Sequence, residues 1–299
     1  ETIKVEINSN VDFQVTIPSD VDWIKETWTR AISTHTKYFK IATNSPNQSR
    51  SAEILFTNTE YNLSEKITIN QKAASYVTVH VVQKGTLSDV LAGRELNPES
   101  IISMKIIGEL DAEDFLTIQN MTNLKNLDLE EVNLTELPTK AFYKMKTIEN
   151  LILPNTLTII NDSEFYQSSL KSIIISSNVE MIGEYAFYEC PLKSINIPAS
   201  VKAINKAAFK NCSSLVTITF SKGSMLTKIC GGKGFLSHGE KYYYGAFANC
   251  TALTSIEIPA NVEIIEEAAF KNCTALTTVT FENNSSLKTI CGATYDYSY

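Results

Sequence analysis

The sequence lacks the features that mark several large classes of protein. It contains no run of about eighteen or more apolar residues, so we expect no segment that inserts into a membrane. Asp and Glu (33) outnumber Lys and Arg (26), and the formal net charge is −7. Because proteins bind nucleic acid by neutralising its phosphates with basic side chains, we expect no nucleic-acid partner.

An export signal, in which a charged segment precedes an apolar one, is also missing from the start of the chain. Either the protein stays in the cytosol or this chain begins after a signal that has been removed. The opening letters "ETIKVEINSNVDFQVTI" already alternate apolar and polar residues as a strand does. We therefore favour the removed signal.

Residues that support catalysis or hold metals are sparse. The three histidines, His35, His80 and His238, lie in different regions, and none is beside a candidate nucleophile. No G-x-S-x-G, H-E-x-x-H or phosphate-cradling glycine loop occurs. No C-x-x-C pair occurs either. We therefore expect no enzyme activity, no catalytic residue, no metal site and no cofactor.

One acidic cluster spans Glu109, Asp111, Glu113 and Asp114. It suits a calcium site, an acid–base pair or the first turn of a helix. We favour a short helix that begins at Asp111, because acidic side chains there accept hydrogen bonds from free amides and oppose the helix dipole.

Short alternating segments fill residues 2–73, among them "TIKVEI", "DFQVTI", "KYFKIAT", "AEILFT" and "KITIN". Clusters of Asn, Ser and Pro separate them, and no long helical segment interrupts them. Several short strands at even spacing predict a β-sandwich over residues 1–74.

The same half resembles the BACON domain, an immunoglobulin-like module of Bacteroidetes surface proteins. The resemblance rests on "NVDFQVTIPSDVDWIKE", "SRSAEILF" and "KITINQKA", although Phe13 stands where the family usually has tryptophan. It implies an immunoglobulin-like sandwich with Trp23 in its core. It also proposes carbohydrate binding, although many family members look like spacers. Trp28 is either an exposed contact or an edge filler.

From Phe142 onward the chain repeats one phrase, of which "AAFKNCSSLVTITF" and "AAFKNCTALTTVTF" are two copies. The steps between the repeated phenylalanines are 23, 22, 22, 38 and 23, so one unit carries an insertion at 231–245. A period near 22–23 lies in the range of leucine-rich repeats. The phenylalanines are Phe142, Phe165, Phe187, Phe209, Phe247 and Phe270.

The consensus A-F-x-x-C-x-x-L-x-x-I-x-I-P-x-x-V-x-x-I resembles the BspA-like leucine-rich repeats of bacterial surface proteins. The expected fold class is mainly β: an N-terminal immunoglobulin-like β-sandwich followed by a leucine-rich-repeat solenoid with a short parallel sheet. We place the solenoid at 75–299, with an N-terminal cap and atypical first coil at 75–122 and the repeats at 123–299.

Each repeat letter has a packing role. In a strand such as that of Leu253, Ile256 and Ile258, alternate side chains point inward, and Pro259 ends the strand. Stacked coils therefore predict a buried phenylalanine column. Cysteines three residues later suit either disulfides or a column of buried free thiols, and we favour thiols because the chain is long enough to have a core. They are Cys190, Cys212, Cys250 and Cys273.

A formal glycosylation acceptor of the form N-C-S/T recurs in three repeats, at Asn211, Asn249 and Asn272. Each lies in the expected turn of a coil, where an attached glycan would obstruct stacking. A chain that repeats such a site fits a bacterial origin.

Two surfaces are candidates for binding. The outward strand positions form a stripe along the concave face from Asp128 and Ile152 to its C-terminal end, although Ser and Thr also simply suit exposed strands. The insertion carries three tyrosines that either contact a ligand or pack on the adjacent coil. The candidates are Asn196, Thr219, Glu257 and Thr280 in the stripe, and Phe235, His238, Tyr242, Tyr243 and Tyr244 in the insertion, with Trp28 outside both.

These patterns predict an exported protein, either secreted or held at the cell surface, anchored to the outer membrane through a removed N-terminal segment. We expect non-enzymatic adhesion to a host or matrix protein through the solenoid. The alternatives are glycan binding by the sandwich and a rigid stalk for a missing C-terminal region. Because "SSLKTICG" repeats an earlier segment just before the end, we expect a longer natural protein or a last segment without order.

Overall fold

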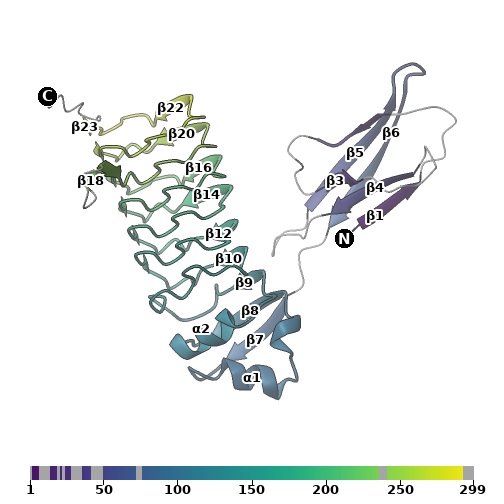
Figure 1. Cartoon of the computed structure of the whole chain (residues 1–299), viewed down its shortest axis with the longest axis horizontal. Coiled ribbons are helices and arrows are strands. Elements are labelled where there is room, and N and C mark those ends of the chain that lie inside the picture. Colours follow the sequence, from purple (N-terminus) through teal and green to yellow (C-terminus); the bar gives the residue numbers. More distant parts are fainter. Residues whose placement is uncertain are drawn as a thin grey trace. The chain divides into compact units, whose positions relative to one another are not determined.

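The computed structural model describes residues 2–6, 14–18, 21, 24–27, 36–41, 50–71, 76–235 and 241–291. The chain forms two compact units, Glu1–Tyr76 and Val77–Tyr299. The described residues are mainly in strands and turns, with two short α-helices near the start of the second unit (Figure 1). None of these helices is long and apolar enough to cross a bilayer.

The N-terminal unit contains two antiparallel sheets of three strands each. In β5 (Arg50–Asn58), Ala52, Ile54 and Phe56 are buried while the residues between them are exposed, as an alternating strand requires. The ring of Phe39 meets that of Phe56 edge to face at 6.4 Å, so both sheets contribute to one core. The strand orders are β1 (Thr2–Glu6), β4 (Thr36–Ile41) and β3 (Ile24–Thr27) in one sheet, and β2 (Gln14–Thr16), β5 (Arg50–Asn58) and β6 (Leu63–Gln71) in the other.

Two parallel strands and two helices begin the second unit. They are β7 (Val77–Val81), α1 (Leu87–Gly93), the 3-10 turn η1 (Pro98–Ser100), β8 (Ser103–Gly108) and α2 (Ala112–Gln119). The predicted helix start at Asp111 is confirmed, since its carboxylate accepts from the amides of Glu113 and Asp114. Asp114 in turn accepts from the amides of Gly85 at 2.7 Å and Leu87 at 2.8 Å. The acidic cluster therefore ties α2 to the turn before α1.

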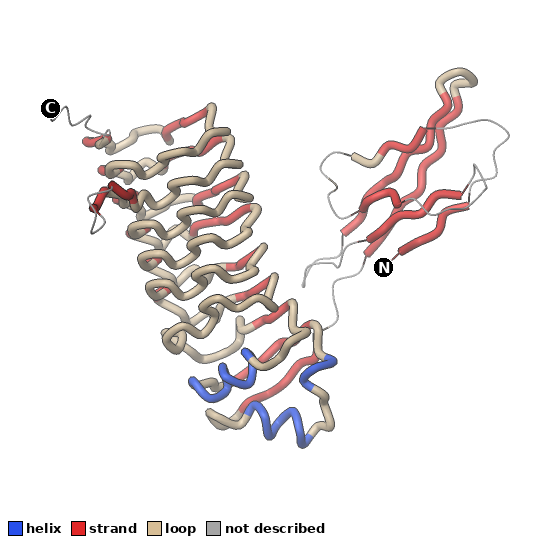
Figure 2. Tube along the Cα trace, in the orientation of Figure 1, coloured by secondary structure: helices blue, strands red, loops and turns tan. Residues whose placement is uncertain are grey.

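The rest of the unit is a solenoid whose coils place parallel strands on two sides (Figure 2). The first side, called the first sheet below, consists of a five-stranded and a four-stranded sheet, and the second side, called the second sheet, is one six-stranded sheet. The predicted solenoid with parallel strands is confirmed. The coils stay in register, with Ile195 opposite Ile218 and Ile256 opposite Val279. The first side continues from β8 through β9 (Asn126–Asp128), β10 (Asn150–Ile152), β12 (Ser172–Ile174), β14 (Ser194–Ile197), β16 (Thr217–Phe220), β20 (Ser255–Ile258) and β22 (Thr278–Phe281). The second consists of β11 (Ile159–Ile160), β13 (Met181–Ile182), β15 (Ala203–Ile204), β17 (Lys228–Ile229), β21 (Ile264–Ile265) and β23 (Thr289–Ile290).

Phenylalanine rings form a continuous stack through the turns that join the second sheet back to the first. From Phe142 to Phe270, successive ring centroids lie 5.0–5.4 Å apart with interplanar angles of 5–23°. Phe115 of α2 meets Phe142 edge to face at 5.7 Å and covers the first end of the stack. Phe142 to Phe247 are at most 2% exposed, whereas Phe270 in the last coil is half-buried.

The repeated cysteines form a second column beside the rings. Each thiol donates a hydrogen bond to the carbonyl oxygen of the phenylalanine one coil earlier, for example Cys212 to Phe187 at 3.0 Å. All six cysteines are free. Burial raises the pKa of the Cys190 thiol to about 11, so this thiol stays protonated and can donate. The equivalent bonds are made by Cys190, Cys250 and Cys273.

Asparagines at the position just before the cysteine form a third column in the later coils. Nδ2 of Asn249 donates to Oδ1 of Asn211 at 2.6 Å, and Nδ2 of Asn272 donates to Oδ1 of Asn249 at 2.9 Å. Their φ angles are 59–64°, a left-handed conformation that asparagine tolerates well. Because a glycan would attach at the same Nδ2 atoms, these acceptor motifs have a structural role in the turns.

Candidate functional site

The insertion forms an antiparallel hairpin of β18 (Lys233–Phe235) and β19 (Lys241–Tyr243). It leaves the coil between Gly231 and Gly245. A Cβ on Gly245 would collide with the carbonyl oxygen of Ala268, and one on Gly231 with that of Glu267. Both glycines therefore let the hairpin emerge while the coil beneath it stays in contact with the next coil.

The hairpin tyrosines pack on neighbouring coils and remain partly accessible. Tyr242 and Tyr244 meet edge to face at 4.7 Å, and Nζ of Lys271 lies 3.2 Å from the centre of the Tyr243 ring. Nζ of Lys210 also donates to the Tyr243 carbonyl oxygen at 2.6 Å. All three rings are half-buried. The two roles considered for them, packing and contact, are therefore compatible.

A ladder of tyrosines on the repeat turns was missed in the sequence. Tyr143, Tyr166 and Tyr188 each follow a core phenylalanine. Their rings stack at 5.3 Å and 17°, then at 4.7 Å and 7°. The signal was present as a Phe-Tyr pair in three successive repeats. In later coils this position is Lys210, Ala248 and Lys271, so the ladder ends after Tyr188.

Tyr185 connects this ladder to the hairpin. Its ring centroid lies 5.8 Å from that of Tyr188. Burial, and then the neighbouring Tyr242, raise the pKa of Tyr185, and a hydrogen bond with Tyr242 raises the pKa of Tyr244 to about 12. We use the name tyrosine surface for Tyr143, Tyr166, Tyr185, Tyr188, Tyr242, Tyr243 and Tyr244.

Cations and amides hold several of these rings in place. Nζ of Lys140 and of Lys144 lie 5.1 and 5.2 Å from the centre of the Tyr143 ring. The hydroxyl of Tyr188 accepts from Nδ2 of Asn211 at 2.9 Å, which joins the tyrosine ladder to the asparagine column. Because the ladder rings cover one another's faces, the ladder presents mainly ring edges and hydroxyl groups.

The predicted stripe on the first sheet is shorter than expected. Asp128 and Ile152, taken as outward, are only 1% and 6% exposed. Asp128 is covered because Nζ of Lys105 on β8 lies 3.5 Å from its carboxylate. The outward positions that are exposed begin at Ile174, which is 56% exposed.

The four stripe candidates, Asn196, Thr219, Glu257 and Thr280, are exposed. Oγ1 of Thr219 donates to Oδ1 of Asn196 at 3.0 Å, so part of the hydrogen-bonding capacity of this face is used within the sheet. The hairpin lies on the opposite side of the solenoid from β14 and β16 (Figure 1). The two candidate surfaces are therefore separate.

Several predicted residues lie outside the described residues. These are Trp28 and His238, together with Trp23, Phe13 and the end of the chain after Cys291. Phe235 is described only through its backbone in β18. Among the described residues, no group of three or more His, Cys, Asp or Glu side chains is arranged to hold a metal ion.

The repeat pattern and the stacked coils coincide with a known protein family. Six copies of the BspA type leucine rich repeat region match residues 103–231 and 240–298, which together make up more than half of the chain. The chain belongs to the BspA-type leucine-rich repeat family. No curated protein matches it.

Solved structures of leucine-rich repeat proteins are similar to this BspA-type chain. A leucine-rich repeat protein from Bacteroides ovatus is 18% identical with a TM-score of 0.46, over 89% of this chain and 53% of that one. The pneumococcal vaccine antigen PcpA is 25% identical with a TM-score of 0.42, over 51% of this chain and 37% of that one. A leucine rich cell surface protein from Faecalibacterium prausnitzii is 16% identical with a TM-score of 0.36, over 79% and 96%. The chain thus spans about half of the length of the Bacteroides ovatus protein.

Proposed function

We propose that this chain is a non-enzymatic, exported binding protein of the bacterial surface that attaches to a host or matrix protein through its solenoid. The single observation that carries the proposal is the tyrosine surface, in which Tyr185 lies between the stacked rings of the repeats and the tyrosine rings of the insertion. Leucine-rich repeat solenoids commonly bind proteins, and tyrosines are favoured contact residues because they bury large area at low entropy cost.

The chemistry of the tyrosine surface favours a protein over a sugar. Sugar rings stack on the open faces of aromatic side chains. In the ladder, Tyr143, Tyr166 and Tyr188 cover one another at 4.7–5.3 Å, which leaves no room for a ring between them. Their edges and hydroxyl groups suit backbone and side-chain groups of a folded protein.

The test is binding of the full chain to a panel of purified matrix proteins by surface plasmon resonance. The double variant Tyr185→Ser with Tyr242→Ser removes the centre of the surface. The matched control is Tyr61→Ser, an exposed tyrosine in the other unit. We expect at least a tenfold loss of affinity in the double variant only. Binding by the double variant equal to that of the control would contradict the proposal.

A second candidate function is glycan binding by the N-terminal unit, as an immunoglobulin-like sandwich of BACON type. Its two three-stranded antiparallel sheets share the core of Phe39 and Phe56, which supports this fold. Residues 1–76 form a compact unit and can be screened alone on a glycan array. Binding there supports the second function. If the full chain binds no matrix protein and the N-terminal unit binds no glycan, the results favour a rigid stalk.

A further inference from the structure

Glu164 occupies a position that is alanine in every other repeat coil. The residue before the stacked phenylalanine is Ala141, Ala186, Ala208, Ala246 or Ala269 elsewhere. Where the next coil has alanine at this position, the phenylalanine amide donates to the carbonyl oxygen of that alanine, as Phe187 does to Ala208 at 2.7 Å. The amide of Phe142 instead donates to Oε1 of Glu164 at 3.3 Å. A side chain therefore replaces a backbone contact between these two coils.

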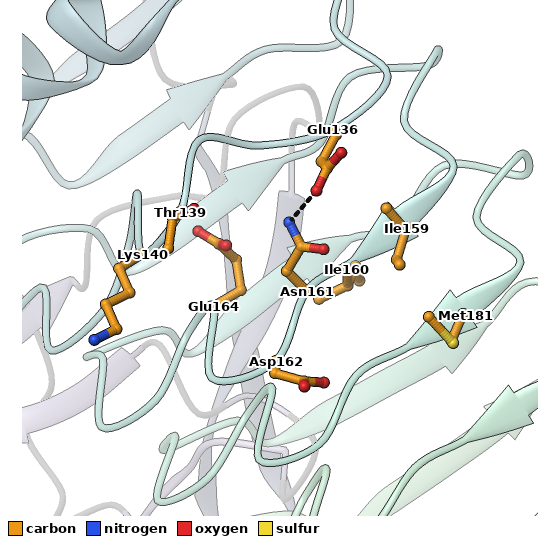
Figure 3. A pocket seen from close by; sticks show the side chains of 9 residues that line it. All are labelled: Glu136, Thr139, Lys140, Ile159, Ile160, Asn161, Asp162, Glu164 and Met181. Carbon is orange, nitrogen blue, oxygen red and sulfur yellow. Dashed lines mark hydrogen bonds between the residues drawn. The ribbon is translucent and has the colours of Figure 1, made fainter.

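A pocket of about 360 Å³ lies beside this replacement (Figure 3). Ile159 and Met181, from the outer face of the second sheet, form an apolar part of its lining. Met181 is 37% exposed although it is apolar. Carboxylates and an amide form the opposite part, from Glu136, Asn161, Asp162 and Glu164.

Among the described residues, no ion pair joins the carboxylates of the pocket to a cation. The side chain of Lys140 turns away from the other lining side chains, and its Nζ lies 5.1 Å from the centre of the Tyr143 ring (Figure 3). Glu136 accepts from Nδ2 of Asn161 at 3.1 Å, and Asp162 from the amide of Glu184 at 2.6 Å. These partners are neutral, so the charge of the site stays negative.

Glu164 marks the buried end of the pocket. Its side chain is 0% exposed, and among the described residues its Oε2 has no hydrogen-bond partner. Burial first, against the opposing effect of the Phe142, Ala141 and Lys140 amides, raises the pKa of Glu164 to about 7. A buried polar atom without a partner is rare in folded proteins and calls for a ligand or another explanation.

We propose that this pocket binds the side chain of an arginine or lysine presented by a protein partner. The aliphatic stem lies against Ile159 and Met181, and the cationic head donates to Oε2 of Glu164. A bare metal ion does not fit, because the carboxylates are not arranged as a metal-binding group. The inference rests on the proposed function in one respect, which is that the partner supplying the arginine or lysine is a protein.

The pocket is tested directly with two short peptides on the full chain. The probe is acetyl-Gly-Arg-Gly-amide, and acetyl-Gly-Gln-Gly-amide is its uncharged counterpart. Binding is followed at pH 8 by the shift of backbone amide resonances. We expect saturable shifts at Lys140 to Phe142 with the arginine peptide and at least tenfold weaker binding of the glutamine peptide.

Two variants locate the contact. Glu164→Gln keeps the size of the side chain and removes its charge, and we expect it to weaken arginine-peptide binding at least tenfold. Glu180→Gln is the control, because Glu180 is exposed, pairs with Lys202 and lies outside the pocket. If Glu164→Gln does not fold, Asp162→Asn at the exposed rim is expected to weaken the same binding.

Equal binding of the two peptides, or full binding by Glu164→Gln, would overturn the inference and assign Glu164 a packing role. Free agmatine distinguishes a small-molecule cation from a protein side chain as the occupant of the pocket. Equal or tighter binding of agmatine would overturn the assignment to a protein side chain. The peptides and agmatine probe the pocket and not the tyrosine surface. A negative result with them would therefore overturn this inference without contradicting the proposed binding of a matrix protein.

Discussion

The rings of Phe209 and Phe247 stack at 5.3 Å and 8°, although 38 residues separate them instead of 22 or 23. The insertion therefore leaves the phenylalanine column undisturbed. The thiol of Cys250 likewise reaches the carbonyl oxygen of Phe209 at 3.2 Å across the same gap. The hairpin is therefore inserted into a coil whose phenylalanine and cysteine keep their places in the two columns.

Removal of the hairpin is expected to leave the solenoid intact. Deleting residues 232–244 joins Gly231 to Gly245 and restores the five-residue step from Ile229 to Phe247 that separates Ile265 from Phe270. We expect a melting temperature within about 4 °C of the full chain, the shift that roughly 1 kcal/mol produces in a large domain. Calorimetry measures it, and a fall of more than about 10 °C would show that the coil needs the hairpin.

Truncation of one ring in the column should destabilise the solenoid strongly. Phe209 is 0% exposed and stacks between two rings, so Phe209→Ala is expected to cost about 3–5 kcal/mol of unfolding free energy. Urea denaturation followed by circular dichroism measures this. Phe281→Ala is the control, since Phe281 is 41% exposed, and it is expected to cost much less. Similar losses in both variants would contradict the column as the main source of stability.

Ionisation of Glu164 should make the free energy of unfolding depend on pH. Burial raises the pKa of its carboxyl from 4.5 to about 7, while Glu136 opposes ionisation further. Between these values the folded protein keeps a proton that the unfolded chain releases. The contribution of Glu164 to stability is therefore fully present below pH 4.5 and is lost as pH rises through 7, by on the order of 3 kcal/mol.

Glu164→Gln cannot titrate and should lack this part of the fall. Urea denaturation at pH 5 and pH 8 compares the two proteins, with Glu180→Gln as the matched exposed control. Parallel changes in all three proteins would show that Glu164 ionises in the folded state as freely as in the unfolded chain.

The cysteines should differ sharply in their reactivity. Cys212 is 0% exposed and its burial raises its pKa well above the ordinary value, whereas Cys291 is exposed. Because the thiolate is the reactive form, we expect Cys291 to react first with a thiol reagent such as dithionitrobenzoate. Cys291→Ser should remove the fast phase. Rapid labelling of Cys212 in the folded protein would mean that the coils open readily.

Much of the solenoid was predictable because the residues that pack in each coil recur with one period along the sequence. A residue that recurs at the same place in each coil meets its own copies, so the columns of Phe187, Cys212 and Asn249 follow from alignment of the repeats. The helix start at Asp111 followed from local chemistry in the same way. The burial of Asp128 and Ile152 could not be predicted from the repeat. For Asp128 it depends on Lys105 of β8, which precedes the repeats.

Sequence alone determined the repeat, its register and the side chains that stack within each column, because translation by one coil brings equivalent atoms together. Only the tertiary structure decided which residues at different positions of the repeat lie next to one another. The turn geometry brings Tyr185 to the hairpin, and it places Glu164, which stands where other coils have alanine, in the lining of a pocket. Such contacts join unlike positions, and no period along the chain encodes them.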